Sequence, residues 1–167
     1  MPLSYAQAVE VVKAKTKKPK LMKKISESNF KRLIGVWKTT GDIKSGQENQ
    51  KLIGVDSYEL ILDGNYILHK ADVQMGNERS ETLEIIQLDN STDRAKMQYF
   101  NTKGEDGIMI SSIINNEFKI EGKGLMFDGT INDENTKIIG KWRIQTENDK
   151  WTDFINLTLE KKLVIFS

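Results

Sequence analysis

The stretch Tyr58-Glu-Leu-Ile-Leu-Asp-Gly-Asn-Tyr-Ile-Leu-His-Lys-Ala-Asp-Val73 decides the fold. Two runs of strand-forming residues flank Asp63-Gly64, a pair that readily adopts the positive φ values of a tight hairpin turn. A two-residue turn pairs Tyr58 with His69, and a three-residue turn reverses which side chains share a face. On the two-residue register one apolar face holds Tyr58, Leu60, Ile67, His69, Ala71 and Val73.

The same pattern of short strands and turns continues to the end of the chain. Further strands are predicted at Glu81 to Leu88, Ala95 to Phe100, Ile108 to Ile114, Glu117 to Gly122, Leu125 to Ile131, Lys137 to Thr146 and Trp151 to Glu160. Turn-forming residues separate them, so consecutive antiparallel pairing is the simplest topology. A meander of about eight to ten strands removes its exposed edges by closing on itself. The sequence therefore predicts an all-β fold, a single antiparallel up-and-down β-barrel.

Composition excludes several classes of function. The 167 residues suit one domain, and 25 Lys and Arg against 24 Asp and Glu create no overall attraction to nucleic acid. The chain has no cysteine, which excludes disulfides and thiolate chemistry. Met1 to Lys20 lacks the apolar core of a secretory signal, and no run approaches the roughly 18 apolar residues of a membrane span. We therefore expect a cytoplasmic protein without a membrane span.

Residues 1–32 are predicted to form a basic helical arm and linker before a barrel domain at 33–167. Ser4 and Gln7 are spaced as a capping box for a short amphipathic helix from Ser4 to Ala14, and a lysine-rich stretch around Pro19 follows. Ser28 is placed to cap a turn that runs through Phe30 to Leu33. The arm is either a solvated tail or a segment that docks on a partner or a second copy, giving a homodimer. Its lysines lack interleaved arginines and aromatics, so nucleic-acid binding is not expected.

Gly35-Val-Trp37, preceded by a short turn, resembles the motif that opens the first strand of lipocalin-like, or calycin, β-barrels. Together with Tyr58 to Leu68 and Gly140-Lys-Trp142, it is similar to a family of uncharacterised bacterial lipocalin-like proteins. The resemblance covers roughly Phe30 to Lys161. It implies a ligand cavity and no catalytic residues. It also implies a basic side chain from a late strand across Trp37, for which Arg143 is the candidate.

The candidate ligand-binding residues are the apolar and aromatic side chains predicted to face the interior, with one histidine among them. They are Trp37, Tyr58, Leu60, Ile67, His69, Tyr99, Phe118 and Trp142. His69 is the only histidine, which excludes a two-histidine metal site. It can be structural, donate a hydrogen bond to a ligand, or supply one axial ligand to a haem as in some related small barrels. No metal and no resident cofactor are otherwise predicted.

The predicted function is binding of a small apolar or amphipathic molecule in the barrel interior. One alternative is an isomerase or cyclase that uses the same cavity, with His69, Tyr58 and Glu59 as its candidate residues. Another is a protein-interaction module that assembles through the N-terminal arm. Glu81 and Glu84 could be imagined as a paired acid and base, but we expect them to lie on a solvated face.

Overall fold

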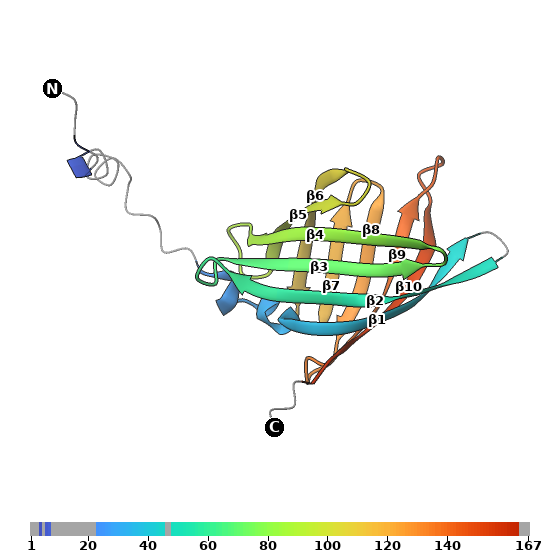
Figure 1. Cartoon of the computed structure of the whole chain (residues 1–167), viewed down its shortest axis with the longest axis horizontal. Helices are drawn as coiled ribbons and strands as arrows, with labels where there is room; N and C mark the ends of the chain where they lie inside the picture. The colour runs from blue at the N-terminus through green and yellow to red at the C-terminus, as the bar shows by residue number, and fades with distance from the viewer. Residues whose placement is uncertain (1–3, 5, 8–22, 46–47, 164–167) are drawn as a thin grey trace.

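The computed structural model describes residues 4, 6–7, 23–45 and 48–163, and within these residues ten antiparallel strands close into one barrel (Figure 1). Each strand pairs with the next, and the last returns to pair with the first. The predicted all-β up-and-down barrel is confirmed. The strands are β1 (Gly35–Ser45), β2 (Glu48–Ile61), β3 (Tyr66–Met75), β4 (Glu78–Leu88), β5 (Arg94–Asn101), β6 (Asp106–Ile114), β7 (Glu117–Gly122), β8 (Leu125–Ile131), β9 (Lys137–Gln145) and β10 (Trp151–Lys161).

The hairpin of β2 and β3 has the register predicted for a two-residue turn. Tyr58 pairs with His69, and Leu60 pairs with Ile67. The loop itself is longer, because pairing stops at Ile61 and Tyr66. Its backbone turns through positive φ at Leu62 (50°), Asp63 (58°) and Gly64 (74°). The extra loop residues leave the pairing unchanged, so the face assignment made from the sequence holds.

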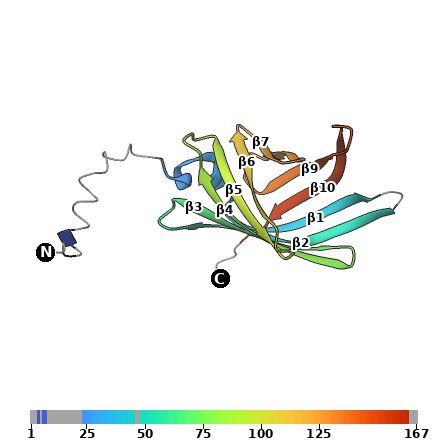
Figure 2. The same ribbon diagram turned by 90° about the horizontal axis from the view of Figure 1, so that it is seen from above.

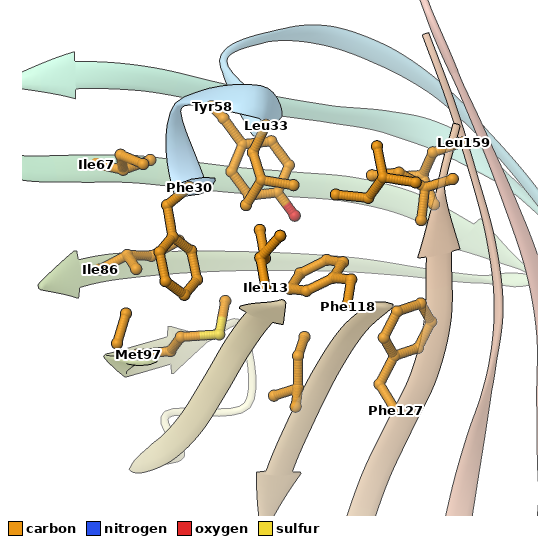
Figure 3. Packing of buried hydrophobic residues seen from close by; sticks show 14 of the residues in the cluster. Phe30, Leu33, Tyr58, Ile67, Ile86, Met97, Ile113, Phe118, Phe127 and Leu159 are labelled. Carbon is orange, nitrogen blue, oxygen red and sulfur yellow. The ribbon is translucent and has the colours of Figure 1, made fainter. Parts of the chain in front are cut away.

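Two short 3-10 helices, η1 (Ile25–Glu27) and η2 (Asn29–Leu33), cover one end of the barrel (Figure 2, blue). The Ser28 side chain accepts a hydrogen bond from the Phe30 N–H at 3.2 Å, which confirms the predicted cap. Phe30 and Leu33 are fully buried against side chains from several strands (Figure 3). These helices therefore form a plug whose apolar residues belong to the barrel core.

Arg32 ties this plug to the loops around it. Its guanidinium donates to the Asn115 carbonyl at 2.6 Å, to Asn116 Oδ1 at 2.8 Å and to the Asn132 carbonyl at 3.2 Å. These acceptors belong to the β6–β7 and β8–β9 loops. On the other side, the Ser26 N–H donates to the Gly64 carbonyl at 3.2 Å. One end of the barrel is thus closed by hydrogen bonds as well as by apolar packing.

Lys161, rather than Arg143, lies across Trp37. The Lys161 ammonium is 4.8 Å from the centroid of the Trp37 ring and donates to the Arg32 carbonyl at 3.2 Å. The prediction for Arg143 is wrong because β9 has no edge with β1, whereas β10 does, and Lys161 is the register partner of Trp37. Arg143 instead forms ion pairs with Asp153 at 3.2 Å and with Asp128 at 3.5 Å.

Local packing explains why glycine and tryptophan occupy their positions in the Gly35-Val-Trp37 motif. Gly35 has a φ of 137°, a conformation that residues with a Cβ rarely adopt, and a Cβ there would meet the Lys161 methylenes at 3.2 Å. The missing side chain lets the lysine stem pass over the strand to reach Trp37. The Trp37 indole N–H is satisfied by the Leu33 carbonyl at 2.8 Å. The motif therefore joins β1, β10 and the plug.

Only a small part of the N-terminal arm falls within the described residues. Ser4 and Gln7 form the predicted reciprocal capping bonds, at 2.9 and 3.3 Å. Residues 5 and 8–22, which include most of the predicted helix from Ser4 to Ala14 and most of the basic stretch after it, lie outside the described residues. In the part of the chain that is described, no helix has the length and apolar character needed to cross a membrane.

Candidate ligand cavity

A cavity of about 380 Å³ lies inside the barrel, beyond the plugged end. All ten strands contribute to its wall, which is mostly apolar and aromatic. Cavities of roughly 300–1,000 Å³ with such walls and a few convergent polar groups are typical small-molecule sites. Its largest aromatic side chains are Tyr58, Tyr99, Phe118, Phe127 and Trp142.

One wall of the cavity holds a chain of charged and polar side chains centred on His69. Its Nε2 donates to Asp56 Oδ1 at 2.7 Å, and its Nδ1 donates to Glu84 Oε1. The Thr39 hydroxyl donates to the other oxygen of Asp56. The ring of Tyr58 stacks on the imidazole, with centroids 4.0 Å apart and planes 3° from parallel. Neighbouring side chains therefore contact both N–H groups of His69 and one face of its ring.

Strand register brings these residues together from distant parts of the chain. β2 and β3 pair Tyr58 with His69, and β3 and β4 pair His69 with Glu84. Asp56 is two residues before Tyr58 and so shares its face of β2. Three adjacent strands thus place one imidazole between two carboxylates.

His69 is protonated at neutral pH in this setting. Burial by itself lowers its pKa, but the charge of Glu84 and the hydrogen bonds and charge of both carboxylates outweigh burial and raise the pKa to about 9. One imidazolium between two carboxylates leaves the cluster with one formal negative charge. Burial, reinforced by Asp56 and Glu84, raises the pKa of Tyr58, which stays a neutral phenol.

Glu84 has an oxygen without a partner. Its side chain is 5% exposed, and Oε1 is engaged by His69, but Oε2 has no hydrogen-bond donor within the described residues. Among the described residues, it is the one buried side-chain nitrogen or oxygen that has no hydrogen-bond partner. Burying a carboxylate oxygen without a hydrogen-bond donor costs free energy. A ligand in the cavity that donates a hydrogen bond to this oxygen would recover that cost.

The structure places five of the eight predicted site residues on the cavity wall: Tyr58, His69, Tyr99, Phe118 and Trp142. Trp37 and Ile67 are fully buried and pack in the main core instead. Leu60 lies near the end of β2 and is 40% exposed. Glu59, a candidate for the enzymatic alternative, is exposed and does not line the cavity.

Sequence reasoning missed Asp56 and Glu84. The expectation that Glu84 lies on a solvated face is wrong, because the pairing of β3 with β4 sets it opposite His69 on the inner face. Glu81, three residues earlier, does lie outside, where it forms an ion pair with Arg79 at 2.9 Å. Alternation from Ile86 would have signalled the inward side of Glu84, and alternation from Tyr58 that of Asp56.

The cluster does not fit a haem or metal site in its present form. Both ring nitrogens of His69 donate hydrogen bonds to carboxylates, so neither has a free lone pair for an axial bond to iron. Among the described residues, no group of three or more His, Asp or Glu side chains is arranged to hold a metal ion.

Comparison with known proteins finds likeness in structure and none in sequence. No family model matches the chain, and no curated protein matches it. The crystal structure of Rv2717c from M. tuberculosis superposes with a TM-score of 0.63 at 8% identity, covering 79% of this chain and 94% of that one. An S-type phycobiliprotein lyase, CPES from Guillardia theta, gives 0.50 at 9% identity, covering 90% and 100%. This chain shares their fold.

Proposed function

We propose that the protein binds a small, largely apolar molecule inside the barrel. The observation that carries the proposal is the 380 Å³ cavity, closed at one end by the plug and walled mostly by apolar side chains, with the charged cluster of His69 on one side. Its ligand would lie with its apolar body against the aromatic wall and its polar end at the cluster.

The charged cluster supports a ligand-binding role for the barrel interior rather than a purely structural one. Burying an imidazolium and two carboxylates is costly, and apolar side chains of similar volume would stabilise a barrel interior at least as well. Perturbed titratable groups at the wall of a cavity are typical of functional sites. The likeness to the two solved structures supports the fold on which the proposal depends.

Nile red, a neutral dye that brightens in apolar surroundings, tests the proposal. We expect one dye per chain and a change in the emission of Trp142, which lines the cavity. Ala71→Phe fills the cavity from β3 and should weaken dye binding by about tenfold or more. Lys70→Phe adds the same ring to the exposed face of β3 and should leave binding unchanged. Absence of dye binding, or equal binding by the Ala71 variant, would contradict the proposal.

A second candidate function is an enzyme of isomerase or cyclase type in the same cavity. It is favoured by Tyr58 and His69, which line the cavity side by side. With its pKa raised to about 9, His69 would donate a proton rather than accept one near neutral pH. This function predicts that a bound compound is converted during prolonged incubation, and that His69→Gln abolishes conversion while binding persists. Mass spectrometry of the recovered compound decides between a binder and an enzyme.

A further inference from the structure

We propose that the ligand carries a cationic nitrogen with N–H donors, such as a protonated amine, amidine or guanidine, that binds Glu84 Oε2. This inference rests on the proposed function and names the chemical class of its ligand. It adds to the proposed binding of an apolar molecule, because it predicts which head group the barrel accepts and which it rejects.

The first step is the unpartnered oxygen. Glu84 Oε1 already accepts from His69, and both N–H groups of His69 are committed to carboxylates, so His69 has no donor left for Oε2, which has no partner within the described residues. The Thr39 hydroxyl is likewise committed to Asp56. Glu84 lines the cavity, so a donor carried by a ligand in the cavity can approach its carboxylate.

The second step is charge. The described residues that line the cavity include three acidic side chains, Asp56, Glu84 and Glu105, and no lysine or arginine. His69 balances only one of the two carboxylates that it contacts. A carboxylate or phosphate in the cavity would add negative charge at a site that already has an excess, whereas a cation would neutralise it.

The third step is the aromatic surroundings of Glu84. Tyr99 on β5 is its register partner, and Tyr58 stacks on the imidazole that contacts it. A Cβ at Gly107 would lie 2.7–2.9 Å from the Tyr99 ring and hydroxyl, so this glycine leaves the space that the tyrosine occupies. Aromatic rings beside a carboxylate attract cations through their faces.

A head-group series tests the inference, with the same ten-carbon chain ending in an ammonium, a hydroxyl, a carboxylate or a trimethylammonium. Each compound competes with Nile red at neutral pH, below its micelle concentration. We expect decylammonium to bind at least about tenfold more tightly than decanol, the scale of a hydrogen bond to a buried charge. Decanoate should bind more weakly than decanol. Decyltrimethylammonium, which has charge but no N–H, should fall between decylammonium and decanol.

Glu84→Gln removes the charge and keeps the shape, so it should lose the preference for decylammonium over decanol. Glu81→Gln makes the same change on the outer face of β4 and should keep that preference. If the Glu84 variant does not fold, Thr82→Lys serves instead. It places an ammonium two residues along the same inner face and should also abolish the preference, with Leu83→Lys on the outer face as its control.

The outcomes separate the two proposals. Binding of Nile red and decanol without any preference for decylammonium overturns the cationic ligand, means that water satisfies Oε2, and leaves the binding function standing. Failure of Nile red and of every compound to bind overturns the proposed function itself. A preference for decylammonium that survives in Glu84→Gln, or in Thr82→Lys where the Glu84 variant does not fold, also overturns the assignment to Glu84.

Discussion

The imidazole of His69 lies flat on the phenol ring of Tyr58, with centroids 4.0 Å apart and planes 3° from parallel. This stack fixes the ring so that its two N–H groups point along the sheet at Asp56 on one side and Glu84 on the other. A protonated histidine held in this way links three strands through one ion. Several measurable consequences follow from that arrangement and from the plug beneath it.

The free energy of unfolding should fall as pH rises from about 6.5 to about 9. The pKa of His69 is about 9 in the folded protein against 6.5 for an unperturbed histidine, so folding favours its protonated form. That stabilisation is complete below pH 6.5 and is lost as pH rises through the folded pKa, an effect of at most about 3 kcal/mol. Urea unfolding at several pH values measures it.

The control for this pH dependence is His69→Gln, whose unfolding free energy should be nearly flat over the same range. Measurements stop at about pH 9.5, because the pKa of Tyr58 is raised above 10.0 and adds a further loss of stability at higher pH. A wild-type protein with no decline between these limits would contradict the charged state assigned to His69.

The pKa of His69 should fall in Glu84→Gln, because that variant loses the carboxylate whose charge raises it most. Asp56→Asn should lower it as well. Since the chain has one histidine, a single imidazole resonance in the proton NMR spectrum reports the titration without assignment. Glu81→Gln is the matched control and should leave the pKa of His69 unchanged. An unchanged titration in Glu84→Gln would contradict the contact.

Lys161→Met should destabilise the protein by about 0.5–2 kcal/mol through loss of the cation over Trp37. Methionine retains much of the apolar stem, so the variant isolates the charged end. Arg143→Met should cost less than 1 kcal/mol, since its ion pairs lie at the surface. Thermal unfolding compares the two. A larger effect at Arg143 would contradict the stabilising role assigned to the contact between Lys161 and Trp37.

Arg32→Ala should destabilise the protein by about 2–4 kcal/mol, because several loop acceptors lose a charged donor at once. Hydrogen exchange should speed up in the β6–β7 and β8–β9 loops, which the guanidinium joins. Lys31→Ala changes an exposed neighbour on the same short helix and serves as the control. Equal stability of the two variants would show that apolar packing alone holds the plug.

Much of the barrel was predictable from local signals. The Asp63-Gly64 turn, the strand predicted from Lys137 to Thr146 and the cap at Ser28 each depend on residues close together in the chain. The register at His69 followed from the turn as well. The start of β2 at Glu48 was missed, because Glu48 to Ser57 is mostly polar and lacks a clean alternation. Long-range pairing with β1 and β3 makes it a strand.

The sequence by itself determined that this chain forms a closed meander, because turn chemistry and two-residue periodicity act over a few residues. Only the tertiary structure decided the site. Asp56, His69 and Glu84 meet because three strands stand in one register, and Lys161 reaches Trp37 because the last strand closes on the first. Contacts of this kind depend on how the strands pair and how the sheet closes. The neighbouring carboxylates then change what the histidine does, since the same imidazole in water would release its proton about 2.5 pH units lower.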